Sequence, residues 1–432
     1  MRLFTLALLT LLFGLVAIAA PTAHAQTFGV ELHNTLMPAS GGMAGTSIAR
    51  PQDLQSALHG NPATIAQFRG TQFSFGGGWV EPTLNMNHTG NNVLPGITPY
   101  SAKSEAEGTT LGNIGVTQDL RALGKPITVG VGLISASGAG LSYRDVAASN
   151  GTTALFQVLQ MTGGAGMDLN DRLSVGASVM MGIATLDGPF NGLTAAAADY
   201  ALRANLGMSY DLGCNTTLGA YWQTEQSFNF DDAIRLQVGT GPITYSTTRD
   251  MNLGLPNNFG FGLANDGLMD GRLLLAFDVL YKQWDDTDLF GALYTNQWVF
   301  QCGGQYELND RIRLRLGYAF AENATEPNPG GSAGGVSPPG AQDAIQYVQA
   351  LLPAINEHRL TMGVGVRDVL PGVDFDILAG GMLEESQNYG SLTTGSLESY
   401  WIAAGFTWRF GRGSCERLPV PNDWCCGDGG CY

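Results

Sequence analysis

Charged side chains are scarce in this sequence. Asp, Glu, Lys and Arg make up 13% of the residues, against about 25% in typical soluble domains. Long apolar runs are missing after residue 25, so the sequence offers no transmembrane helix beyond that point. A surplus of positive charge is missing too, because the net charge is −16. We therefore expect no nucleic-acid partner, since nothing would offset phosphate repulsion.

Catalytic and metal-binding patterns are also absent. After residue 25 the histidines are His33, His59, His88 and His358, and none stands in a nucleophilic or metal-ligand pattern. The run Gly76-Gly77-Gly78 is not a phosphate loop. We expect a protein that is not an enzyme, with no metal and no cofactor.

The first 25 residues have the pattern of a signal peptide. Arg2 precedes an apolar stretch from Leu3 to Ala20, and Ala23-His24-Ala25 forms a small-x-small cleavage site. We predict cleavage after Ala25, so that Gln26 begins the mature protein. The alternative is a membrane anchor that is retained.

Glycine is abundant, at 60 of 432 residues, and alternation of apolar with small or polar residues dominates residues 71–410. One clear case has apolar Ile312, Leu314, Leu316, Tyr318 and Phe320 alternating with Arg311, Arg313, Arg315, Gly317 and Ala319. Strands with one face in lipid and the other in a wet lumen accept such arginines. We therefore predict an all-β fold, a transmembrane antiparallel β-barrel, with a soluble β-sandwich as the alternative.

Connections between the predicted strands alternate in length. Short turns of Asn, Asp and Gly, such as Asn309-Asp310-Arg311, alternate along the chain with long stretches such as Ala324 to Pro353. Bacterial outer-membrane barrels have short periplasmic turns and long outer loops. We count about 14 strands in residues 71–410, and we expect a monomer surrounded by outer-membrane lipid.

Residues 26–70 show no strand alternation and are rich in Gly, Ala and Ser. A barrel of about fourteen strands would otherwise leave an open hole, so we predict that this segment is an N-terminal plug in the lumen. The alternative is a disordered periplasmic arm.

Several motifs resemble those of the FadL family of outer-membrane long-chain fatty-acid transporters. They are Phe28-Gly29-Val30, Ser40 to Gly45, the triplet Asn61-Pro62-Ala63 before Phe68, Leu255-Pro256 followed by Asp278, Tyr281 and Trp284, and the stretch Pro353 to Gly363. The resemblance implies a fourteen-stranded barrel with an N-terminal plug, to which the triplet belongs. It also implies that a hydrophobic ligand is caught at the outer loops and leaves sideways where the third strand is kinked.

Two glycines lie where this sideways exit is expected. Gly138 and Gly140 lie in the predicted third strand, Ile127 to Tyr143, near the position of the family's kink. Glycines inside a strand mark bends or bulges, so we expect the lateral opening there. The alternative is that they relieve crowding in the lumen.

Candidate ligand-binding residues come from two places: strand positions that the alternation of side chains predicts to face the lumen, and one loop. The basic candidates facing the lumen are Arg203, Arg272, Arg311, Arg313, Arg315 and Arg359; alternatively, they only line the lumen electrostatically. In the longest loop, a helix capped by Asp343 would place Ile345, Val348 and Leu351 in one apolar stripe. This stripe would either dock an apolar ligand or pack against the barrel rim.

The stretch after Phe410 departs from a typical barrel end. Residues 411–432 contain Cys415, Cys425, Cys426 and Cys431, whose spacing is not a standard zinc pattern. We predict a disulfide-bonded periplasmic tail, which Cys214 could join.

The function expected from these features is uptake of hydrophobic small molecules across the outer membrane, with long-chain fatty acids first. The alternatives are aromatic or alkane hydrocarbons as substrates, or a structural or receptor barrel that transports nothing. A carboxylate ligand needs a buried cation in its binding pocket, whereas a hydrocarbon does not.

Overall fold

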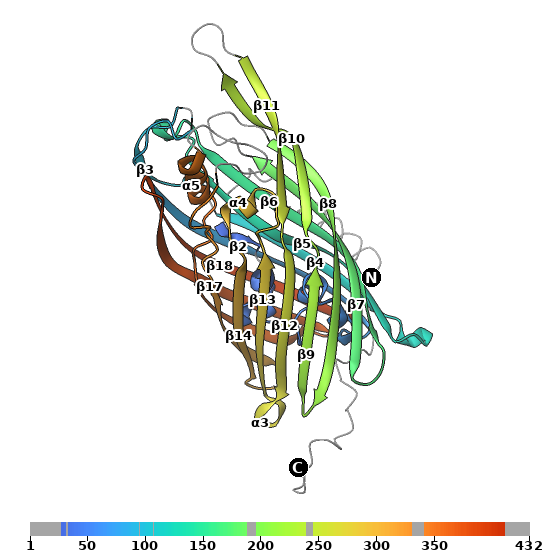
Figure 1. Cartoon of the computed structure of the whole chain (residues 1–432). Helices are drawn as coiled ribbons and strands as arrows, with labels where there is room; N and C mark the ends of the chain where they lie inside the picture. The colour runs from blue at the N-terminus through green and yellow to red at the C-terminus, as the bar shows by residue number, and fades with distance from the viewer. Residues whose placement is uncertain are drawn as a thin grey trace, which may run out of the picture.

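A computed structural model describes residues 27–31, 33–94, 96–106, 108–187, 196–238, 245–330 and 341–410. The predicted signal peptide and the cysteine-rich tail lie outside these residues. Within them, a single antiparallel sheet of sixteen strands curves round and closes on itself (Figure 1). No helix among the described residues is long and apolar enough to cross a membrane.

Fourteen of the sixteen strands form the barrel wall, because β1 and β3 only add to strand edges. The wall closes where β18 pairs with β2 along its whole length. The predicted strand number is therefore confirmed. The wall strands are β2 (Thr71–His88), β4 (Thr109–Asp119), β5 (Ile127–Ser142), β6 (Thr153–Asp168), β7 (Leu173–Asp187), β8 (Ala196–Gly213), β9 (Thr216–Gln223), β12 (Asn257–Gly267), β13 (Leu273–Gln283), β14 (Gln297–Glu307), β15 (Ile312–Ala321), β16 (His358–Leu370), β17 (Val373–Tyr389) and β18 (Thr393–Phe410).

The alternation seen in the sequence sets the two faces of the wall. On β15, Leu316 is 65% exposed on the outer face, while Arg313 and Arg315 are buried inside. On β18, Tyr400 and Ile402 are exposed and Trp401 is buried between them. Because side chains on a strand alternate between faces, one apolar face meets lipid and the other lines the lumen.

The two ends of the barrel differ. One end carries short turns with η4 (Arg121–Leu123) and α3 (Leu268–Gly271). The other carries β3 (Tyr100–Lys103), η5 (Ala147–Ser149), α4 (Phe290–Leu293), α5 (Ala341–Leu351) and the hairpin β10 (Gln226–Val238) and β11 (Tyr245–Leu255), which projects beyond the wall (Figure 1). The ladder of this hairpin runs from the pair Gln226 and Leu255 to the pair Val238 and Tyr245. We call the second end the outer end.

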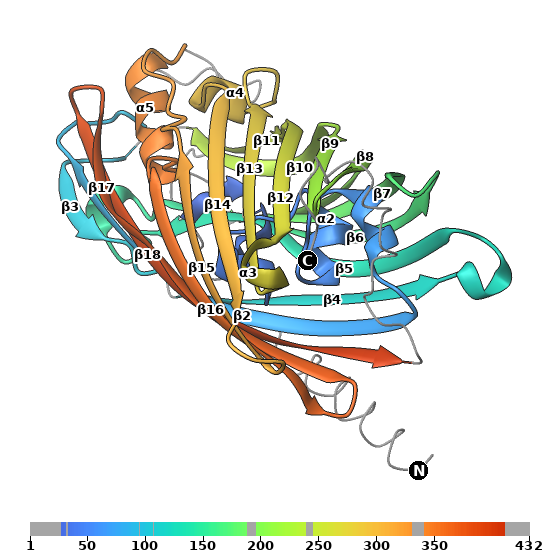
Figure 2. The same ribbon diagram turned by 90° about the horizontal axis from the view of Figure 1, so that it is seen from below.

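The segment before β2 folds inside the barrel, as Figure 2 shows for α2. It contains β1 (Thr27–Glu31), η1 (His33–Leu36), η2 (Ser40–Met43), α2 (Leu54–His59) and η3 (Pro62–Gln67). Asp53 caps α2 by accepting from the Ser56 N–H at 2.8 Å, and its other oxygen accepts from the Ser40 N–H at 2.7 Å. One buried carboxylate thus joins two parts of this plug.

Candidate functional site

The wall is interrupted between β4 and β5. Their ladder ends at the pair Asn113 and Ile134, although β4 continues along β2 as far as Thr109. Beyond Ile134, β5 stays paired with β6 up to Ser142, after a bulge between Ser135 and Ser137. A bulge bends its strand, so β5 leaves β4 here while it keeps β6.

The two predicted exit glycines lie in this separated stretch. Gly138 pairs with Gln157 and Gly140 with Leu155 on β6, and both are buried. The structure thus brings the glycines to the part of β5 that has lost its β4 partner.

The edge of β5 that β4 vacates pairs with the start of the plug. In β1, Thr27 lies opposite Ala139, and Glu31 lies opposite Ser137. The plug therefore contacts the interrupted part of the wall through backbone pairing.

Glu31, at the end of β1, is held by three strands of the wall. Its carboxylate accepts from Arg203 Nη1 on β8 at 3.1 Å and from Asn258 Nδ2 on β12 at 2.9 Å, and it lies 3.4 Å from Lys282 Nζ on β13. Burial alone would raise the pKa of Glu31, but the charges of Lys282 and Arg203 lower it to about 2. Glu31 is therefore ionised at neutral pH.

Two plug histidines next to this cluster are neutral. His33 Nε2 lies 3.1 Å from the Tyr221 hydroxyl, and the His33 and His59 rings are 6.0 Å apart. Burial lowers the pKa of His59 to about 4 and holds the pKa of His33 well below its usual value. The formal charges around Glu31 are therefore those of Arg203, Lys282 and, across a small cavity, Arg359.

That cavity has a volume of about 20 Å³ and is lined by Glu31, Lys282, Arg359, Asn356, Trp284 and Tyr294, among others. This is room for about one water molecule. An organic ligand therefore enters only if side chains or β1 move. We call this space the inner cavity.

Aromatic rings fill the space above the inner cavity. Phe156, Phe228, Phe230, Trp284, Phe290 and Tyr294 are each at most 2% exposed, and we call them the aromatic cluster. Trp284 packs 5.5 Å from Phe290 and 5.4 Å from Tyr294, in edge-to-face geometry. Because Trp284 also lines the inner cavity, it joins the two.

The predicted apolar stripe lies on α5, and we call it the α5 stripe; it packs into the same apolar core. Ile345, Val348 and Leu351 are 2%, 8% and 0% exposed. Of the two roles that the sequence leaves open, the buried stripe fits packing, because α5 lies over the barrel mouth and turns its apolar face inward. The apolar face of α5 therefore lies next to the aromatic cluster and is closed to solvent.

The other basic candidates lie away from the inner cavity. Arg313 pairs with Asp374 at 2.9 Å and Arg315 with Asp376 at 2.6 Å. Arg272 is exposed at the short-turn end, where it donates to the Glu307 and Leu308 carbonyls at 3.0 and 2.8 Å. Of the arginines predicted by parity, Arg203 and Arg359 are the ones that reach the inner end of the plug.

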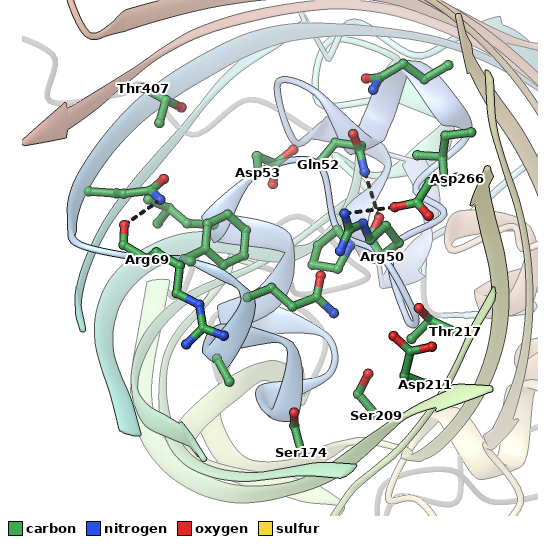
Figure 3. A pocket seen from close by; sticks show the side chains of 18 of the residues that line it. Arg50, Gln52, Asp53, Arg69, Ser174, Ser209, Asp211, Thr217, Asp266 and Thr407 are labelled. Atoms are coloured by element: carbon green, nitrogen blue, oxygen red, sulfur yellow. Dashed lines mark hydrogen bonds and ion pairs between the residues drawn. The ribbon is translucent and has the colours of Figure 1, made fainter. Parts of the chain in front are cut away.

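A charged vestibule of about 1000 Å³ lies below the plug at the short-turn end. Figure 3 shows Arg50 of the plug paired with Asp266 of the wall, at 2.8 Å. Arg69 pairs with Asp168 at 3.3 Å. Arginines and carboxylates both line this space, so it is a poor path for an apolar molecule.

The triplet Asn61-Pro62-Ala63 fixes the plug to the wall. Asn61 Oδ1 accepts from the Ala63 N–H at 3.1 Å, and Asn61 Nδ2 donates to the carbonyls of Ile48 and Met208 at 2.8 and 2.9 Å. One amide thus caps η3 and joins two plug segments to β8. A Cβ on Gly207 would lie 2.0 Å from Asn61 Oδ1, so a glycine is needed where the triplet meets the wall.

The predicted disulfide tail is outside the described residues. Cys214, in the turn after β8, is disulfide-bonded, and the other described cysteine, Cys302, is free on the outer face of β14.

Sequence reasoning missed Glu31 and Lys282. A usable signal was present, because Glu31 and Asp53 are the two acidic residues of the 26–70 segment. An acid in an apolar plug that enters a lumen rich in arginine predicts an ion pair.

Comparison with known proteins agrees with this architecture. A family model described as "Outer membrane protein transport protein (OMPP1/FadL/TodX)" matches residues 16–329. The toluene transporter TodX of Pseudomonas putida is similar, with a TM-score of 0.65 and 18% identity over 87% of this chain and 98% of that chain. A FadL homologue of Pseudomonas aeruginosa gives 0.66 and 13% over 89% and 100%. The toluene transporter TbuX of Ralstonia pickettii gives 0.58 and 16% over 88% and 100%.

At these identities the solved structures show likeness of fold. No curated protein matches the sequence. The family model covers more than half of the chain, and the fourteen-stranded barrel agrees with it. The chain therefore belongs to the OMPP1/FadL/TodX family of outer-membrane transport proteins for hydrophobic compounds, and it is not an enzyme.

Proposed function

We propose that this transporter takes up small uncharged aromatic molecules, which enter through the aromatic cluster and leave sideways between β4 and β5. The observation that carries the proposal is the aromatic cluster itself. Its six buried rings reach the inner cavity through Trp284. Offset and edge-to-face contacts favour an aromatic guest by about 0.5–1.5 kcal/mol per ring pair beyond area burial.

The charges beside the cluster support an uncharged ligand. Arg203 and Lys282 already share the Glu31 carboxylate. Two of the solved relatives are described as toluene transporters, and another is described as a monoaromatic hydrocarbon channel. Aromatic hydrocarbons, which ranked second in the sequence analysis, are therefore better supported than long-chain fatty acids.

A sideways exit is supported by the interrupted ladder and by the lower vestibule. An apolar ligand that leaves between β4 and β5 meets acyl chains, which are as apolar as the cluster. A ligand that continued downward would expose its surface to water and charge, at about 25 cal/mol per Å². The plug also blocks the downward path through its contacts with the wall.

Long-chain fatty acids remain the second candidate because of one observation. Lys282 and Arg359 both line the inner cavity, and buried cations suit a carboxylate ligand. The two candidates differ in whether the inner cavity receives a charged group.

Binding to the purified barrel tests the proposal. Equilibrium dialysis with radiolabelled toluene and palmitate would compare the natural chain with a Phe156→Ala/Phe290→Ala variant. The matched control is Phe261→Ala, whose ring is 60% exposed on the outer face. We expect toluene affinity to fall about 5- to 150-fold in the double variant, from the loss of about 1–3 kcal/mol of ring contact, and to stay the same in the control. Tighter binding of palmitate than of toluene by the natural chain would favour fatty acids.

A further inference from the structure

The surroundings of Glu31 are those that a ligand carboxylate would require. Arg203, Lys282 and Asn258 all direct N–H donors at the carboxylate oxygens, at 2.9 to 3.4 Å. Charge-assisted hydrogen bonds of this kind are stronger than neutral ones. The site is thus a complete carboxylate receptor whose occupant belongs to the protein.

The Arg203 donor of this receptor is held by the wall and does not depend on Glu31 for its position. Arg203 Nε donates to the Thr224 carbonyl at 2.8 Å, and Arg203 Nη2 donates to the Pro256 carbonyl at 2.5 Å. The Arg203 side chain is 1% exposed. Its guanidinium therefore stays in place when the carboxylate is removed.

The local charge balance rests on one residue. Among the described residues that line the inner cavity, Glu31 supplies the sole carboxylate, while Lys282 and Arg359 supply two cations. Without Glu31, Lys282 on the cavity wall and Arg203 behind it would both lose the carboxylate with which they pair. A buried charge that is left unpaired is strongly unfavourable, so the emptied site would favour any anion of suitable size.

A tethered carboxylate competes strongly with a free one. Glu31 is held close to the cations by the pairing of β1 with β5 and by the chain that continues into η1. A group attached by a short linker has an effective concentration of about millimolar or more. A free carboxylate with the same intrinsic affinity for the cations must exceed that concentration before it displaces Glu31. An uncharged ligand has no such competitor.

We infer that Glu31 is a specificity residue that occupies the place of a ligand carboxylate and so restricts the inner cavity to uncharged ligands. This inference rests on the proposed uptake of uncharged aromatic molecules. Toluene and benzoate are a suited pair of probes, because they are similar in size and differ in the carboxylate.

The experiment measures the affinities of purified barrels for radiolabelled toluene and benzoate at neutral pH by equilibrium dialysis. In Glu31→Gln the carboxylate is replaced by a neutral group of the same shape. We expect the ratio of benzoate to toluene affinity to rise at least tenfold. Adding Lys282→Met to that variant should reverse most of the rise, since it removes one of the two freed cations.

The matched control is Glu384→Gln, which removes an exposed carboxylate on β17 and should leave the ratio unchanged. Glu31→Ser is measured in parallel, and heat-modifiable gel mobility selects the variants that assemble. An unchanged ratio in the assembled Glu31 variants, or natural-chain binding of benzoate as tight as that of toluene, overturns the inference. Failure of the natural chain to bind toluene contradicts the proposed function instead, and the benzoate measurements then decide the role of Glu31 by themselves.

Discussion

Asp278 fastens the plug to the barrel wall, and its replacement by alanine should loosen the plug measurably. Its side chain comes from β13 and is fully buried. The oxygen Oδ2 accepts from the backbone N–H groups of Ser47 and Ile48 at 2.6 and 3.0 Å. In Asp278→Ala both N–H groups lose their partner while they remain buried.

The expected size follows from these two contacts. A buried donor left unsatisfied costs about 1–3 kcal/mol, so the two together weaken this part of the plug by about 2–6 kcal/mol. Local opening that becomes easier by about 2 kcal/mol reduces hydrogen-exchange protection roughly thirtyfold. Asp278→Asn keeps an acceptor oxygen and should lose less.

Hydrogen exchange read by mass spectrometry on peptides that cover residues 44–50 is the direct assay. Ion conductance in planar bilayers is a second one, because a plug that leaves the lumen opens a pore. The control is Asp286→Ala, an exposed acid at the outer end, which should change neither. Full protection of residues 44–50 in an assembled Asp278→Ala barrel would refute the assignment of Asp278 as an anchor.

Three further predictions follow from the plug, the exit and the outer loops. The pKa of His59 is lowered to about 4, and that of His33 lies well below its usual value. The stability of the plug should therefore be complete above pH 6.5 and decline as the pH falls from 6.5 toward 4. In melting curves His59→Gln should flatten this decline, and a natural-chain profile that is level over this range would contradict the prediction. Replacing Gly138 and Gly140 with valine should reduce toluene uptake while gel mobility shows an assembled barrel, and undiminished uptake would count against the sideways exit. Replacing all three residues of the α5 stripe with serine should loosen the outer loops, since each loss of a buried aliphatic side chain costs about 2–5 kcal/mol; limited proteolysis would detect this, and resistance equal to that of the natural chain would show that the stripe is not structural.

The sequence by itself determined the architecture of the wall. Leu314 and Leu316 face lipid, and Arg313 and Arg315 face the lumen, because neighbouring residues of a strand point to opposite sides. Strand number and turn lengths are equally local properties, readable from periodicity and from Asn, Asp and Gly turns. The position of the plug triplet was also visible, as Asn61 needs little beyond its neighbours to cap η3.

Tertiary structure alone decided the site. Arg203 is 172 positions from Glu31 along the chain, and Lys282 is 251 positions away. Alternation along the strands predicts that Arg203, Arg313 and Arg315 all face the lumen. In the structure Arg203 pairs with the plug carboxylate, whereas the other two pair with aspartates of the wall. The inward turn of α5 and the parting of β5 from β4 likewise depend on what packs against them. The reason is physical: periodicity reports which side of a strand a residue occupies, whereas ion pairs and burial depend on the depth at which distant segments meet inside the closed barrel.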